Sequence, residues 1–143
     1  MLKTRVLAIA AIVGLAAAAL TGCSGKLTTE EACNFLVEKG NELEIKAVSE
    51  ELISSVENSD SAGAKASAEK LKDWLLQGAG ESADGDFKDA LEFTASKMND
   101  VVDARLDANS DSTLSAQETE ALASEEHREV LRTSCPQIGE YLG

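Results

Sequence analysis

Apolar residues recur every three or four positions through most of the chain after residue 27, a spacing typical of amphipathic helices. The first such series predicts a helix over residues 29–57. Thr28 and Glu31 have the spacing of a capping box at its start. Gly40 and Asn41 interrupt the series, and both residue types leave the right-handed helical region easily. They could therefore kink or split the helix, and the sequence leaves open whether it breaks at Gly40.

Two more helices are expected in the middle of the chain. A polar turn over residues 58–61 is able to cap a helix over residues 62–77, which Gly78 is expected to end. Trp74 lies on the apolar side of this helix, which favours a core position over a ligand contact. The third helix is capped by Asp84 or Asp86, and its apolar stripe extends to Leu106.

The fourth predicted helix has a thin apolar face. Ser115 and Glu118 mark its start with capping-box spacing, and Pro136 marks its end. The remaining tail carries Ile138, Tyr141 and Leu142, which are available to fold back on the helices. Together these elements predict an all-α domain, a small antiparallel bundle of about four helices.

Composition agrees with one small acidic helical domain. The chain has 143 residues with one Pro and 3% aromatic residues, which argues against β-sandwiches because these need frequent turns and strand-forming residues. A formal net charge of −13 argues against nucleic acid as a partner. No catalytic motif occurs, and His127 lies among glutamates on a helix face expected to be exposed. We therefore expect a protein that is not an enzyme.

The first 22 residues have the organisation of a secretion signal. Lys3 and Arg5 precede an apolar run from Val6 to Leu20, which is shorter than the roughly 20 residues of a membrane-spanning helix. A cleaved signal peptide over residues 1–22 is therefore favoured over an uncleaved membrane anchor.

The run ends in Leu20-Thr21-Gly22-Cys23, which resembles the lipobox of bacterial lipoproteins. The resemblance implies that Cys23 receives diacylglycerol on its sulfur and becomes the first residue of the mature chain. Two or more acyl chains anchor a protein stably, since each buried CH₂ contributes about 0.8 kcal/mol. The alternative is an ordinary cleaved signal followed by an unrelated cysteine.

The mature chain would then consist of a lipidated cysteine and tether over residues 23–27 and an acidic helical domain over residues 28–143. Because residues 1–22 contain two basic residues and no acidic one, cleavage lowers the formal charge to −15. The expected location is the outer, non-cytoplasmic side of a membrane.

Cys33 and Cys135 remain as an even pair in a compartment where disulfides persist. We predict a disulfide between them. An even number of antiparallel helices would bring these two positions to the same pole of a bundle. A reactive or metal-binding pair is the alternative, although neither cysteine has a CxxC neighbour.

Residues 107–118 resemble the twelve-residue calcium loop of an EF-hand. The resemblance implies Ca²⁺ ligands at Asp107, Asn109, Asp111, Thr113, Ser115 and Glu118. Ser112 stands where that family has glycine, so only weak binding is expected. Turn propensity alone also selects such residues between helices, and Ser115 with Glu118 is already accounted for as a helix cap.

These observations favour a membrane-anchored, exported lipoprotein whose acidic helical domain binds a protein partner. The alternative is a calcium-binding module built on the single loop over residues 107–118.

Overall fold

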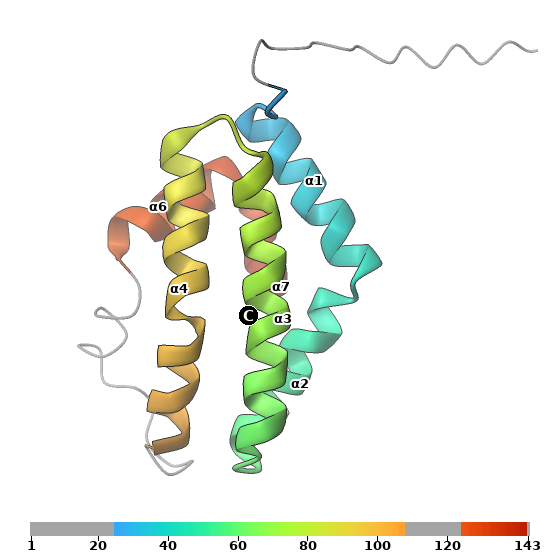
Figure 1. The fold of residues 1–143 in the computed structure, drawn as a ribbon, viewed down its shortest axis with the longest axis vertical. Helices are drawn as coiled ribbons and strands as arrows, with labels where there is room; N and C mark the ends of the chain where they lie inside the picture. The colour runs from blue at the N-terminus through green and yellow to red at the C-terminus, as the bar shows by residue number, and fades with distance from the viewer. Residues whose placement is uncertain (1–24, 108–123, 143) are drawn as a thin grey trace, which may run out of the picture.

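The computed structural model describes residues 25–107 and 124–142, which form α-helices and no strand (Figure 1). The predicted all-α class is therefore confirmed for this part of the chain. The elements are α1 (Thr29–Glu42), α2 (Ile45–Glu57), α3 (Ser61–Glu81), α4 (Gly85–Asp107), α6 (Glu125–Ser134), the 3₁₀ helix η1 (Pro136–Ile138) and α7 (Gly139–Leu142).

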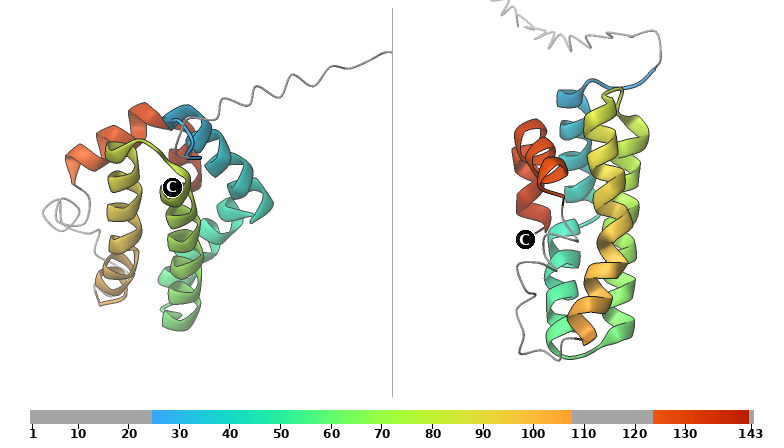
Figure 2. Two further views of the ribbon diagram at one scale, coloured as in Figure 1. Left: turned by 45° about the horizontal axis from the view of Figure 1, so that its top comes forward. Right: turned by 90° about the vertical axis from the view of Figure 1, so that its left-hand side faces the viewer.

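The two longest helices, α3 and α4, form an antiparallel hairpin at the centre of the molecule (Figure 1). α1 and α2 pack along α3 and meet at an outward-pointing elbow. α6 crosses α4 near the N-terminal end of α4, and η1 and α7 continue behind α3 (Figure 2). This arrangement does not establish a bundle of four antiparallel helices, because the predicted first helix is two helices and α6 is much shorter than α4.

The break between α1 and α2 lies at Leu43 and Glu44, beyond the predicted position at Gly40 and Asn41. Glu44 adopts a left-handed conformation with φ 52° and ψ 39°. Gly40 is a buried helical residue, and a Cβ added to it would lie 2.9 Å from Cε1 of Tyr141. Gly40 is therefore needed for close packing against the C-terminal segment, and it does not end the helix.

α3 begins as expected, with the Asp60 side chain accepting a hydrogen bond from the Gly63 backbone N–H at 3.0 Å. The prediction that Gly78 ends this helix is wrong, since α3 continues to Glu81. A Cβ at Gly78 would lie 2.5 Å from the Leu36 side chain. The glycine thus lets α1 approach α3 closely at this crossing.

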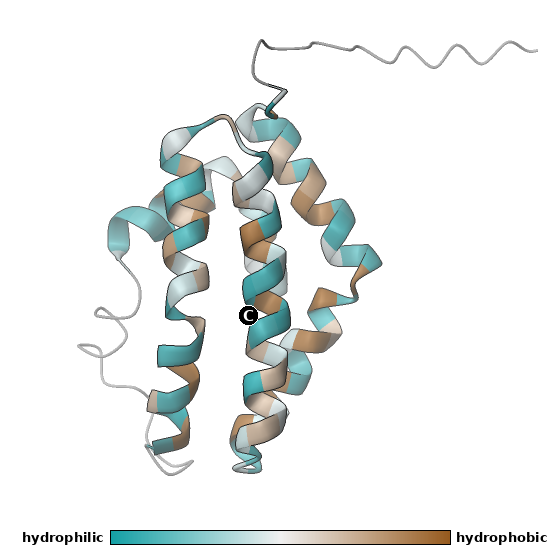
Figure 3. Ribbon diagram, viewed as in Figure 1, coloured by the Kyte–Doolittle hydropathy of each residue, from teal (hydrophilic) through white to brown (hydrophobic). Residues whose placement is uncertain are grey.

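The main hydrophobic core lies where α1, the start of α2, α3, α4, α6 and the C-terminal segment meet. Trp74 is fully buried there, as predicted, and its indole Nε1–H donates a hydrogen bond to the Leu36 carbonyl at 2.9 Å. A second, smaller cluster between α3 and the far end of α4 contains Ala64, Ala68 and Val102. Hydrophobic residues alternate with polar ones along every helix, as the periodicity predicted (Figure 3).

The C-terminal tail folds back, as predicted. Ile138 and Tyr141 are buried in the main core, and the Tyr141 hydroxyl donates a hydrogen bond to Asn41 Oδ1 at 2.9 Å. α6 ends at Ser134, just before Pro136, as expected. The predicted start of this helix at Ser115 and Glu118 lies outside the described residues.

Candidate functional site

The folded part of the chain begins at the pole formed by the start of α1, the end of α3 and the start of α4. Leu27 donates its N–H to the Glu81 carbonyl and accepts from the Ala83 N–H, both at 2.8 Å, and the Lys26 ammonium hydrogen-bonds the Gly80 carbonyl. The predicted tether over residues 23–27 is therefore already held to the domain at Lys26. Cys23 and the lipobox lie outside the described residues.

Two helix caps organise this pole. Thr28 and Glu31 form the predicted capping box of α1, and hydrogen bonds from the Thr28 backbone and hydroxyl lower the pKa of Glu31. Asp84 accepts a hydrogen bond from the Thr29 hydroxyl at 2.6 Å and one from the Phe87 N–H at 3.1 Å. These bonds lower the pKa of Asp84, and they join the starts of α1 and α4.

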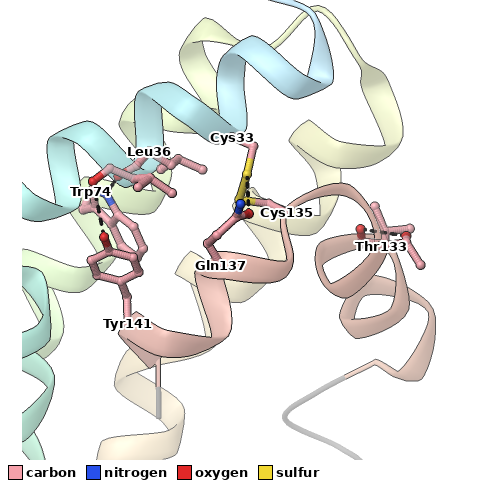
Figure 4. The surroundings of a disulfide bond; sticks show 9 residues. Cys33, Leu36, Trp74, Thr133, Cys135, Gln137 and Tyr141 are labelled. Atoms are coloured by element: carbon pink, nitrogen blue, oxygen red, sulfur yellow. Dashed lines mark hydrogen bonds between the residues drawn. A yellow bond between two sulfur atoms is a disulfide. The ribbon is translucent and has the colours of Figure 1, made fainter.

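The predicted disulfide between Cys33 and Cys135 is present, with the two Cα atoms 5.3 Å apart (Figure 4). It joins the first turns of α1 to the residue that ends α6. The bond is buried, since Cys33 is 5% exposed and Cys135 is 0% exposed. Trp74 and Tyr141 belong to the same core and pack against each other, with their ring centroids 5.4 Å apart. The disulfide therefore links α1 to the C-terminal segment around the main core.

The structure describes only one of the six predicted calcium ligands. Asp107 is exposed and is the last residue of α4. Asn109, Asp111, Thr113, Ser115 and Glu118 lie outside the described residues. Within residues 25–107 and 124–142, no group of three or more histidine, cysteine or acidic side chains has the geometry to hold a metal ion.

His127 is half-buried, in contrast to the exposed position expected from its glutamate neighbours. Its ring stacks on Phe93 of α4 with centroids 4.3 Å apart, and its Nδ1 is buried without a hydrogen-bond partner. Sequence reasoning missed this contact because the stacking partner lies on another helix and has no periodic relation to residue 127.

A shallow hollow of about 540 Å³ lies between α2 and α3 beside the elbow. Sequence reasoning missed it, because its existence depends on the break at Glu44. Buried Ile45 and Val48 contribute to its floor, and Leu43, 47% exposed, stands at its edge. The other lining residues are Glu44, Ala47, Glu51, Lys70, Asp73 and Gln77. A second hollow of about 470 Å³, on the side of the elbow that faces α7, shares Glu44 and Ala47.

Of the helices that the structure describes, none has both the length and the hydropathy of a membrane-spanning segment. No protein-family model matches the chain, and no curated protein and no solved structure shows significant similarity to it.

Proposed function

We propose that this protein is a lipoprotein, anchored through acyl chains on Cys23 to the outer side of a membrane, whose acidic helical domain binds a protein partner without catalysing a reaction. The observation that carries the proposal is the order of features at the N-terminus. A basic start and an apolar run of 15 residues lead directly to Leu20-Thr21-Gly22-Cys23.

Two structural features support this proposal. The Cys33–Cys135 disulfide is of the kind that persists in exported proteins and is rare in the cytosol. The domain is also held from Lys26 onward, which leaves two residues between it and Cys23. Such a linker spans at most about 10 Å including its bonds to both neighbours, so the N-terminal pole would lie close to the lipid surface.

Mass spectrometry of the chain purified from membranes of a bacterium with the lipoprotein pathway tests the anchor. We expect a mature product that begins at Cys23 and carries acyl chains, and we expect Cys23→Ser to leave the membrane fraction. Ser24→Ala, which changes the residue next to Cys23 in the sequence, is the matched control and should remain on the membrane. An unmodified Cys23 thiol, or a leader still attached to the chain recovered from the membrane, would contradict the proposal.

Calcium binding is the second candidate function. It is favoured by the six ligand-type residues at EF-hand spacing and by the end of α4 at Asp107, where that motif has its incoming helix. Calorimetry on the chain from residue 24 should show binding heat at millimolar Ca²⁺, with a dissociation constant on the order of 10⁻⁴ to 10⁻³ M. Glu118→Gln should abolish the heat, whereas Glu126→Gln should leave it unchanged. Equal heats in all three chains would exclude the site.

A further inference from the structure

We infer that the hollow between α2 and α3 is the docking surface for a basic segment of the partner protein, one that presents an apolar side chain flanked by lysine or arginine. This inference deepens the proposed function and rests on it, since it assigns the partner's chemistry and the face that binds it.

Helical spacing makes the hollow an elongated surface. Its α2 wall consists of positions 44, 47, 48 and 51, and its α3 wall consists of positions 70, 73 and 77. Each set follows three- and four-residue steps along one face of its helix. Seven residues of helix rise about 10 Å, so the two walls form a groove two turns long. Its length suits a short peptide segment, and its volume of about 540 Å³ accommodates one or two side chains.

The apolar part of the groove is accessible to a partner. Leu43 is 47% exposed at the edge, and Ala47 is also exposed. They stand next to the buried side chains of Ile45 and Val48. An apolar side chain placed here would therefore cover Leu43 and extend the main core outward.

The charges around the groove select a cationic occupant. Glu44, Glu51 and Asp73 line it, and Lys70 is the one basic residue among its lining residues. Across the described part of the chain, none of these four side chains forms an ion pair with another residue. Their charges are therefore available to a partner.

Two other occupants fit the observations less well. A bound metal ion would need converging ligands, and the described residues contain no cluster of three that could hold one. A second copy of this chain would bring the same excess of negative charge, formally −15 after loss of residues 1–22, against the three carboxylates. A segment that carries an apolar side chain beside lysine or arginine would cover the apolar floor and pair its positive charge with the carboxylates.

The test uses the chain from residue 24, which contains every helix that the structure describes, and three synthetic 14-residue peptides. The first peptide, Lys/Leu, has leucines at three- and four-residue steps and lysines at the positions between them. The second, Glu/Leu, replaces the lysines with glutamate, and the third, Lys/Ser, replaces the leucines with serine. We expect two-dimensional amide NMR to show saturable shifts at residues 43–51 and 70–77 with the Lys/Leu peptide. The Glu/Leu and Lys/Ser peptides should bind at least about fivefold more weakly, since each lacks one of the two contributions.

Substitutions of exposed residues then show which side chains contact the peptide. Leu43→Ala, and separately Glu51→Gln combined with Asp73→Asn, should each weaken binding about fivefold. Leu76→Ala and Glu126→Gln change exposed residues that do not line the groove, and they should have no effect. The double carboxylate variant should also lose most of the salt dependence of binding.

Three outcomes would overturn the inference: shifts centred elsewhere on the domain, equal binding of the Glu/Leu peptide, or concentration-dependent shifts at the groove without any peptide, which indicate a second copy. Because this experiment needs no lipid, its failure leaves the anchor proposal to be judged by the mass of Cys23.

Discussion

The two ends of the helical domain are built in different ways. The end that contains the chain's described N-terminus has the disulfide, Trp74, Phe87 and most of the large buried side chains. The opposite end, where α2 turns into α3 and α4 ends, is packed around a cluster of Ala64, Ala68 and Val102. Buried area scales with side-chain size, so the hydrophobic contribution per residue is smaller at this second end.

The difference indicates where stability is concentrated. Close approach of backbones at the first end depends on Gly40 and Gly78, and covalent closure depends on Cys33 and Cys135. At the second end, an apolar groove of about 450 Å³ between α2 and α4 leaves Ile53 half-exposed. We therefore expect perturbations at the first end to affect global unfolding and the second end to open locally.

Removal of the disulfide should have the largest effect. Cys33→Ser combined with Cys135→Ser releases a loop closed over 102 residues, and we expect the free energy of unfolding to fall by about 2–5 kcal/mol. Urea denaturation of the chain from residue 24 measures the change. Hydrogen exchange should show that amides of α1 and α7 lose more protection than those near Ala64.

Reduction of the native chain with a thiol reagent is the control, because it should reproduce the variant's stability and leave the variant itself unaffected. A loss of protection that is equal at both ends, or a loss of stability below about 1 kcal/mol, would contradict the proposed concentration of stability.

Gly78→Ala should have the next largest effect. The added methyl group would lie 2.5 Å from the Leu36 side chain, so either this side chain or the two helices must shift, at a cost of about 1–3 kcal/mol. Gly80→Ala is the matched control two residues along the same helix. No atom lies within 4 Å of its added Cβ, and the lost flexibility of the unfolded chain should stabilise the domain by about 0.4–1 kcal/mol.

A double-mutant cycle sharpens this result. Leu36→Ala alone should destabilise the domain. The double variant Leu36→Ala/Gly78→Ala should lose less stability than the sum of the two single losses, because the smaller side chain at position 36 leaves room for the methyl group. Additive costs would show that the contact between these two positions does not limit the packing.

Local features of the fold could be predicted from the sequence, and contacts between helices could not. The caps at Thr28, Asp60 and Asp84 were predictable because a cap involves residues three or four positions apart. The disulfide followed from the count of cysteines and the expected compartment. Gly40 and Gly78 were misread as helix breakers because their packing partners, Tyr141 and Leu36, belong to other segments.

The proposed docking surface was also not predictable from local sequence, because it lies between two helices. Its carboxylates were predictable as exposed residues, but the hollow exists because the chain turns at Glu44, a non-glycine residue with positive φ that no local preference marks. The predicted lipid site at Cys23 and most of the predicted calcium loop fall outside the described residues, so these remain predictions.

The smallest effect concerns Asp84, which joins the starts of α1 and α4 at the N-terminal pole. Hydrogen bonds from Thr29 and Phe87 favour its ionised form and hold its pKa below the ordinary value of 3.8. A carboxyl group whose pKa is lower in the folded state stabilises the fold fully above its unfolded pKa. This contribution is lost as the pH falls through the lowered, folded-state pKa.

Asp84→Ala should therefore cost about 1 kcal/mol at neutral pH, the usual loss for a helix cap, and the difference from the native chain should shrink as the pH falls from the ordinary pKa of 3.8 through the lowered pKa of the folded state. Asp84→Asn keeps one acceptor oxygen, which can replace only one of the two hydrogen bonds, and it cannot titrate, so it should remove the pH dependence with a smaller loss of stability than Asp84→Ala. Asp86→Asn, an exposed neighbour, is the control for the charge at the start of α4. If the free energy of unfolding of the native chain and that of Asp84→Ala differ by the same amount from pH 7 to pH 2, the ionised form of the Asp84 carboxylate does not stabilise this pole.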